Sequence, residues 1–196
     1  MQKFCGVTQP VVGRILAGRV RPNGATLRAG DYMRLGIECE LAVRIAKPLP
    51  LLAEGTEPTH LLDHVDAIAA AFELVEDRDA DYKVLDAFSI IAENSWNMGM
   101  VLGGLALPTE VADLANLEGK LVVDGQGLAV GVSSDIMGSP LHVLAWLARF
   151  ATEMKLEVRP GDWIMTGSII STVFAAKGRH YRFELGDLPP VEVSIV

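Results

Sequence analysis

Two glutamates, Glu38 and Glu40, stand one residue apart in an alternating run over residues 37–45. The odd positions of this run are apolar, and the even positions carry Glu, Glu, Ala and Arg. A period of two predicts a β-strand with one face in a core, so both carboxylates project from the other face, with Cα atoms about 7 Å apart. Such a pair can bind one hard divalent cation, because Mg²⁺ takes oxygen ligands and retains waters that substrate oxygens can replace. A solvated strand face is the alternative interpretation.

A third acid, Glu73, lies inside the apolar run of residues 70–75, where an unpaired carboxylate would be costly to bury. It must be paired, protonated or bound to a metal. Arg78 is the nearby partner for a structural ion pair, and this possibility stays open at this point. The acids that follow, Asp77, Asp79 and Asp81, are typical of a solvated turn.

Other candidate chemistry is weaker. His60 and His64 have a spacing that can chelate zinc, but no third ligand accompanies them, and we interpret them as surface histidines. The sequence contains no dinucleotide fingerprint, P-loop or nucleophile elbow, which disfavours nucleotide enzymes and serine hydrolases. Thr166, Gly167 and Ser168 end a predicted strand, and their hydroxyl and amide groups can hold a carboxylate or oxo group, although an ordinary turn is the commoner explanation.

The elements that position these residues are mostly predicted strands. We expect strands at about 36–46 and 71–75, a run at 98–104, a hairpin of 121–123 with 128–132, and strand-like pieces from 179 to 196. A helix is predicted from residue 59 or 60 to about 70, a helical turn over 86–94, and an irregular segment over 1–34. The clearest helix begins at Ser139-Pro140 and carries one apolar stripe, formed by Leu141, Leu144, Ala145, Ala148, Ala151 and Met154. Strands with two or three helices outside them indicate an α+β fold.

Bulk properties exclude several protein classes. The 196 residues suit one domain, 1–196, and half of them are hydrophobic, which disfavours disorder. A net charge of −8 disfavours a nucleic-acid or anionic-membrane partner. No apolar run is long enough for a membrane span, there is no signal-peptide pattern, and two distant cysteines suggest no disulfide framework. We therefore expect a soluble, cytoplasmic protein.

Taken in order, six segments resemble the fumarylacetoacetate hydrolase superfamily, in its 2-oxo-acid hydratase and decarboxylase branch. They keep family order and roughly family spacing across nearly the whole chain, so together they are specific to the superfamily. The segments are residues 6–10, 36–48, 71–78, 91–94, 138–148 (Gly-Ser-Pro-Leu followed by Ala-Trp-Leu-Ala) and 161–168.

The resemblance implies that Glu38 and Glu40 are the Glu-x-Glu metal pair and that Glu73 is the third metal carboxylate. It implies a rolled, mixed β-sheet structure resembling a β-sandwich, with a few flanking helices and the site in its mouth. The implied activity is that of a Mg²⁺- or Mn²⁺-dependent lyase, a hydratase or decarboxylase for a small 2-oxo acid or its enol, as in meta-cleavage aromatic catabolism. It also implies a homo-oligomer, a dimer or larger. Residues 166–168 are the candidate substrate contacts.

The sequence departs from the family pattern in three places. Hydratases of this branch carry a Gly-x-Lys-x-Gly-x-Thr-Ser segment just before the stretch that aligns with Met1; Val11 stands where aspartate follows Gln-Pro, and Glu93 stands where aspartate is usual. The metal site is unaffected, but the general acid or base is unassigned. Two alternatives therefore stay open: a C–C bond hydrolase of the same superfamily, and a truncated, non-catalytic metal-binding subunit that needs a partner. Against hydrolysis, no histidine matches the water-activating base of the true hydrolases.

Overall fold

The computed structural model describes residues 9–53, 56–111 and 113–196, so the first three residues of the 6–10 segment lie outside the described residues. Its strands form two five-stranded sheets. Sheet A has the order β1 (Val20–Pro22), β5 (Asn97–Leu102), β4 (Val65–Glu76), β3 (Leu35–Ile45) and β8 (Trp163–Phe174). Sheet B has the order β2 (Ala25–Leu27), β10 (Val191–Ile195), β9 (His180–Leu185), β6 (Glu118–Val123) and β7 (Gln126–Val132).

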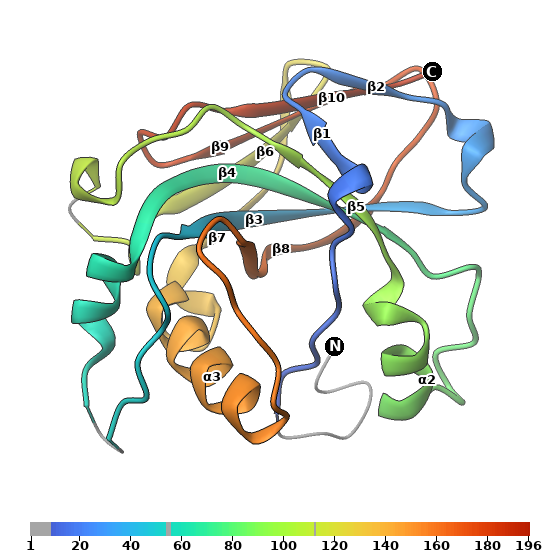
Figure 1. The fold of residues 1–196 in the computed structure, drawn as a ribbon. Helices are drawn as coiled ribbons and strands as arrows, with labels where there is room; N and C mark the ends of the chain where they lie inside the picture. The colour runs from blue at the N-terminus through green and yellow to red at the C-terminus, as the bar shows by residue number, and fades with distance from the viewer. Residues whose placement is uncertain (1–8, 54–55, 112) are drawn as a thin grey trace.

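Both sheets are mixed, because β1 pairs with β5 and β2 with β10 in parallel, while the other neighbours are antiparallel. Two α-helices, α2 (Ala87–Ala92) and α3 (Pro140–Glu153), lie on the side of sheet A that faces away from sheet B (Figure 1). Six short 3₁₀ helices connect the described elements: η1 (Ala17–Arg19), η2 (Ala29–Asp31), η3 (Pro58–His64), η4 (Asn94–Trp96), η5 (Pro108–Glu110) and η6 (Ser133–Asp135). The expected α+β fold of rolled mixed sheets with a few flanking helices is confirmed.

The core lies between the two sheets. The odd residues of β3, such as Ile37 and Leu41, are almost fully buried there, together with Phe183 of β9. Phe72 of β4 meets Phe183 with ring centroids 6.2 Å apart and so joins the sheets directly. Because side chains alternate along a strand, the even residues of β3 point away from sheet B, toward the side on which the helices lie.

Strand β4 corrects one prediction. The expected helix from 59 or 60 to 70 is a 3₁₀ helix that ends at His64, and from Val65 onward the chain is strand. The run from Ala67 to Leu74 is small, apolar and buried on nearly every position, because β4 lies between β3 and β5 and is covered on both faces. A strand buried on both faces loses its alternation, so the periodicity of its first residues was misleading.

Other predicted elements are found with shifted ends. The hairpin is β6 with β7, and its turn is Asp124-Gly125, whose φ values of 49° and 81° fit a two-residue hairpin turn. The expected helical turn is α2, with Asp86 at its N-cap accepting a hydrogen bond from the Ser89 amide (2.8 Å). The segment 1–34, expected to be irregular, contains the short strands β1 and β2, joined at the predicted turn over residues 22–24.

Helix α3 begins as predicted, since the Ser139 hydroxyl caps the Leu141 amide and Pro140 is the first helical residue. Leu144 is fully buried within its stripe, whereas Met154 is 59% exposed and does not belong to it. Met154 is wrong as a stripe residue because the helix ends at Glu153 and Met154 is its C-cap. No helix in the described part of the chain is long and apolar enough to span a membrane.

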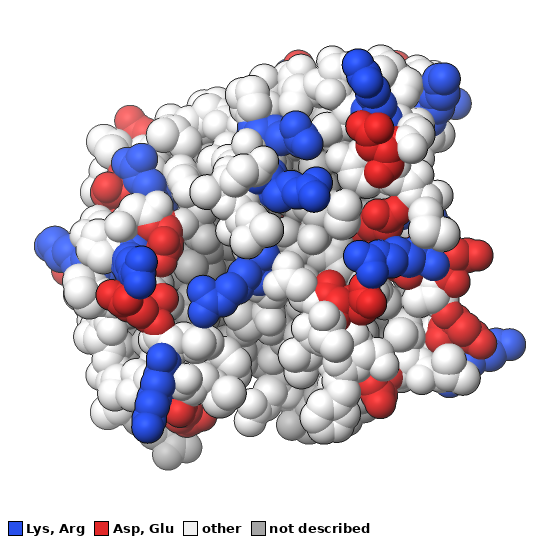
Figure 2. All heavy atoms as spheres, turned by 45° about the vertical axis from the view of Figure 1, so that its right-hand side comes forward, with Lys and Arg blue, Asp and Glu red and all other residues white. Residues whose placement is uncertain are grey.

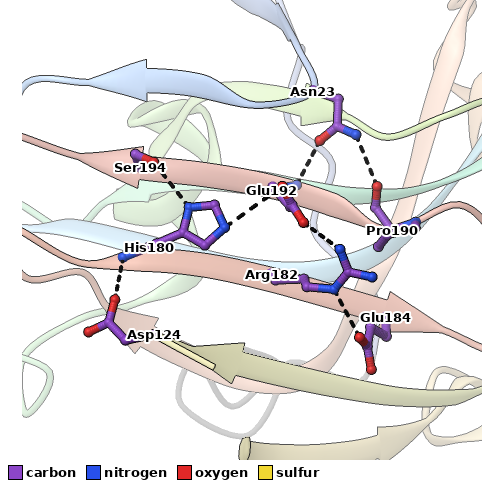
Figure 3. Close-up of polar contacts among 8 residues, drawn as sticks. All are labelled: Asn23, Asp124, His180, Arg182, Glu184, Pro190, Glu192 and Ser194. Carbon is purple, nitrogen blue, oxygen red and sulfur yellow. Dashed lines mark hydrogen bonds and ion pairs between the residues drawn. The ribbon is translucent and has the colours of Figure 1, made fainter. Parts of the chain in front are cut away.

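The outer face of sheet B carries polar side chains that bond to one another across strands (Figure 3). Arg182 of β9 bridges Glu184 and Glu192, and the His180 ring lies 3.0 Å from the Ser194 hydroxyl. Asn23 links the turn after β1 to β10, because its Oδ1 accepts a hydrogen bond from the Glu192 amide at 2.7 Å. These pairs are partly exposed, so they favour a solvated outer face and contribute little to stability.

Candidate metal centre

Three carboxylates meet on the face of sheet A that points away from sheet B. The antiparallel register of β3 with β4 places Glu38 directly opposite Glu73, and Glu40 lies two residues farther along the same face of β3. One carboxylate oxygen from each residue lies within 4.8 Å of the other two. The residues expected to form the metal pair and its third ligand are therefore brought together by the fold.

Each of these carboxylates accepts a hydrogen bond from a neutral donor. The Gly167 amide of β8 donates to Glu40 Oε2 at 2.7 Å, and Asn97 Nδ2 of β5 donates to Glu73 Oε1 at 2.7 Å. The Thr172 hydroxyl of β8 donates to Glu38 Oε1. Since the donors carry no charge, they orient the carboxylates without neutralising them.

The electrostatics of the group favour either a proton or a cation. Burial and the neighbouring Glu73 and Glu38 raise the pKa of Glu40, which is 1% exposed. Burial, followed by repulsion from Glu38, raises the pKa of Glu73 to about 7. Burial also raises the pKa of Glu38. Three crowded carboxylates whose ionised forms are disfavoured fit a hard divalent cation, which prefers an all-oxygen donor set.

No Lys or Arg of the described residues makes an ion pair with this group. The possible pair of Glu73 with Arg78 is not formed, because Arg78 pairs with Glu93 beyond the end of β4. Arg34 pairs with Asp77 and Asp79, with nitrogen–oxygen distances of 3.3 Å. Any cation that balances the triad therefore comes from outside these side chains.

Asp77 was expected in a solvated turn, but it is 3% exposed. Its carboxylate accepts a hydrogen bond from the Tyr82 hydroxyl at 2.6 Å as well as pairing with Arg34. Burial and the bond to Asp77 raise the pKa of Tyr82 to about 12. The prediction of a solvated turn failed because Asp77 contacts Arg34, which precedes β3, and Tyr82, which lies in a turn. The sequence around Asp77 does not reveal these contacts.

The predicted segment 166–168 lies beside the triad but does not end a strand, since β8 continues to Phe174. The pairing of β8 with β3 shifts register at three places, two of which flank the pair of Glu40 with Ser168. Gly167 has a φ of 110°, and an added Cβ would lie 3.2 Å from Ile136, so glycine is what lets this amide face Glu40. The Thr166 hydroxyl donates to the Leu41 carbonyl (2.9 Å) and the Ser168 hydroxyl to that of Ile170 (2.5 Å).

Two residues of the site were not identified from the sequence in this role. They are Asn97, which donates to Glu73, and Thr172, which donates to Glu38. Asn97 follows three residues with positive φ, Asn94, Ser95 and Trp96, and such a strained run of non-glycine residues is most often found at functional sites. The sequence gives no signal that Asn97 and Thr172 donate hydrogen bonds to the acids, because these donors become neighbours of the acids only through strand pairing.

The two histidines, His60 and His64, lie outside the acidic group. His60 and His64 both lie in η3, before β4 begins, and neither belongs to the acidic group. His60 is exposed, as expected of a surface histidine, whereas His64 is half-buried and its Nδ1 is buried without a hydrogen-bond partner in the described structure, so the surface interpretation is wrong for His64.

Known proteins resemble this chain over almost its whole length. The family model described as the C-terminal domain of fumarylacetoacetate (FAA) hydrolase matches residues 16–196. A 4-oxalocrotonate decarboxylase of a Pseudomonas species is 28% identical over 190 residues, covering 96% of this chain and 72% of the relative. A 2-keto-4-pentenoate hydratase of Burkholderia vietnamiensis (strain G4 / LMG 22486) is 28% identical over 194 residues, covering 99% and 73%.

Solved structures show the same fold. The 4-oxalocrotonate decarboxylase of Pseudomonas putida G7, complexed with magnesium and adipate, superposes with a TM-score of 0.89 at 24% identity, covering 100% of this chain and 73% of that one. A fumarylpyruvate hydrolase of Pseudomonas aeruginosa, in complex with Mn²⁺ and pyruvate, gives 0.71 at 19% identity, covering 93% and 76%.

Proposed function

Because the chain belongs to the fumarylacetoacetate hydrolase family, we propose that it is a divalent-metal-dependent lyase, a hydratase or decarboxylase that acts on a small 2-oxo acid or its enol. The observation that carries the proposal is the convergence of Glu38, Glu40 and Glu73, with carboxylate oxygens within 4.8 Å of one another. One buried and two half-buried acids that repel one another are costly to hold together, and a bound cation offsets that cost.

The relatives support a lyase over a hydrolase. The sequence matches reported above are named as a decarboxylase and a hydratase, and a 2-oxo-hept-4-ene-1,7-dioate hydratase of Escherichia coli is 25% identical over 203 residues. The decarboxylase structure superposes more closely than the hydrolase structure, with TM-scores of 0.89 and 0.71. The related structures were solved with magnesium, calcium or Mn²⁺, so Mg²⁺ or Mn²⁺ is our proposal for the ion.

The three glutamates and the cation would have separate roles. Glu38, Glu40 and Glu73 would hold the cation through carboxylate oxygens, each kept in orientation by its own neutral donor. When bound, the cation would act as a Lewis acid that polarises the carbonyl of the 2-oxo acid.

Residues Thr166 to Ser168 are proposed to contact the substrate. In this structure both hydroxyl protons and the Gly167 amide are donated within the protein, so the hydroxyl oxygens would contact a substrate as acceptors, and the expected holding of a carboxylate by these donors is not what the geometry shows. A homo-oligomer and a cytoplasmic location, both expected from the sequence, stay predictions.

The proposal is tested by following absorbance loss of 2-hydroxypenta-2,4-dienoate and carbon dioxide release from 4-oxalocrotonate, with and without Mg²⁺. We expect metal-dependent turnover of one of them, and its loss in Glu40→Gln with the fold retained. Glu153→Gln, an exposed acid on α3, is the matched control and should behave as the wild type. Metal-independent turnover, or hydrolytic C–C cleavage of a fumarylpyruvate-type substrate instead, would contradict the lyase assignment.

A further inference from the structure

The donor that orients Glu73 directly follows a strained turn. Asn97, whose Nδ2 donates to Glu73 Oε1 at 2.7 Å, comes after Asn94, Ser95 and Trp96 in the sequence. These three residues, which we call the strained turn, have left-handed backbone, with φ values of 53°, 56° and 60°. Asparagine tolerates this conformation, but it is unfavourable for the other two side chains. Contacts from outside must therefore keep the strained turn in place, and Asn97 with it.

The segment before β1 provides one set of these contacts. The Arg14 amide donates to Asn94 Oδ1 at 2.7 Å, and Asn94 Nδ2 donates to the Arg14 carbonyl at 2.9 Å. The preceding residue, Gly13, lies against the backbone of the strained turn, because a Cβ added there would be 2.7 Å from the Asn94 carbonyl oxygen and 3.2 Å from Ser95 Cβ. Only glycine allows so close an approach. We call the two hydrogen bonds and this contact the Asn94 clamp.

An aromatic contact provides a second support. The rings of Trp96 and Tyr82 meet edge to face, with centroids 5.8 Å apart and planes at 73°. The Tyr82 hydroxyl donates to the buried carboxylate of Asp77 at 2.6 Å, so the ring is anchored just after the end of β4. The first and the last residue of the strained turn, Asn94 and Trp96, are therefore each held by a side-chain contact to another segment.

An ion pair next to the strained turn adds little to this support. Arg78 pairs with Glu93, the residue before Asn94, but the two side chains are 55% and 42% exposed. Figure 2, in which the side of the molecule that carries α2 comes forward, shows acidic and basic side chains next to one another at the surface. Because exposed pairs of this kind contribute little to stability, we expect the half-buried Asn94 to hold the start of the strained turn.

We propose that Asn94 is a positioning residue of the metal centre, which holds the strained turn against Gly13 and Arg14 and thereby keeps the Asn97 amide on Glu73. Without the clamp, the strained turn relaxes toward right-handed backbone, which is the favoured conformation of its residues. The Asn97 side chain then leaves the carboxylate that it orients. This inference rests on the proposed function, because it concerns the support of the metal centre proposed there.

The test is calorimetric titration of Mg²⁺ into two variants that break the clamp from opposite partners. Asn94→Gly removes both hydrogen bonds but accepts left-handed backbone, and Gly13→Ala pushes the segment off the strained turn. Each should weaken Mg²⁺ binding by roughly three- to tenfold, with the about tenfold loss expected for Asn97→Ala as the upper bound. Two controls should bind as the wild type does: Gly18→Ala, where an added Cβ meets nothing within 4 Å, and Arg78→Gln, which breaks only the exposed ion pair.

A double-mutant cycle separates positioning from general damage to the fold. If Asn94 acts through Asn97, adding Asn94→Gly to Asn97→Ala should change Mg²⁺ affinity by less than about twofold, because the donor is already gone. If Asn94→Gly does not fold, Gly13→Ala in the same two backgrounds replaces it, with the same expectation. Wild-type affinity in the clamp variants, or equal losses with and without Asn97, would overturn the inference alone. Absence of Mg²⁺ binding in the wild type would overturn the proposed function, and the inference with it.

Discussion

At the scale of single residues, the site is defined by acids whose ionised state is disfavoured until a cation is present. The folded-state pKa of Glu73, about 7, lies above its ordinary value of 4.5, so the metal-free fold binds this proton more tightly than the unfolded chain does. The resulting stabilisation is fully present below about pH 4.5 and is lost as the pH rises through about 7.

We therefore predict that the free energy of unfolding of the metal-free protein falls between pH 5 and pH 8, at up to about 1.4 kcal/mol per pH unit for one such group. Mg²⁺ should reverse the fall, because it binds the deprotonated carboxylates, and its affinity should rise over the same range. Urea unfolding at several pH values with and without Mg²⁺ measures both effects. Glu73→Gln should flatten the profile; an unchanged slope in that variant would contradict the assignment.

Asn97 gives a second prediction at this scale. Asn97→Ala removes the donor that orients Glu73 and should weaken Mg²⁺ binding by about tenfold, the lower end of what loss of such a partner costs. Calorimetric titration of Mg²⁺ checks it, with Asn116→Ala as the control, because the Asn116 amide donates to Asp113 in the segment before β6 of sheet B and makes no bond to the triad in the described structure. Equal affinities would show that Glu73 needs no orienting donor.

At the scale of elements, α3 contributes through its buried stripe. Leu144 is fully buried, so Leu144→Ala should lower the free energy of unfolding by about 2–5 kcal/mol. Met154→Ala, at the exposed C-cap, should change it by less than about 0.5 kcal/mol. Chemical denaturation of the two variants measures the difference, and similar losses in both would show that the helix is packed otherwise.

At the scale of the whole molecule, the two sheets are held together by one core. Phe183 of sheet B is fully buried and meets Phe72 of sheet A. Phe183→Ala should therefore cost about 3–5 kcal/mol. Denaturation curves with and without Mg²⁺ check this, and the metal should add the same increment to variant and wild type, since the triad lies on the opposite face of sheet A. A selective loss of the metal increment would show that core and site are coupled.

Much of the local structure could be predicted from the residues alone. Alternation along 37–45 predicted that Glu38 and Glu40 share one face, because side-chain direction in a strand depends only on position. The Ser139-Pro140 signal likewise fixed the start of α3, because capping is a contact between neighbours in sequence. The apolar run around Glu73 singled it out as a third acid, and the resemblance then assigned it as the third metal ligand, which no spacing could have done.

Tertiary structure decided the contacts between distant segments. Strand register sets Glu73 opposite Glu38 and brings Asn97, Gly167 and Thr172 to the carboxylates. Arg78 pairs instead with Glu93, beyond the end of β4. Tertiary structure also made the second half of the predicted helix, from Val65 onward, a strand, because burial on both faces outweighed the local pattern. Which acid meets which donor depends on strand order and bulges, and these are properties of the assembled sheet, with no signal in the residues themselves.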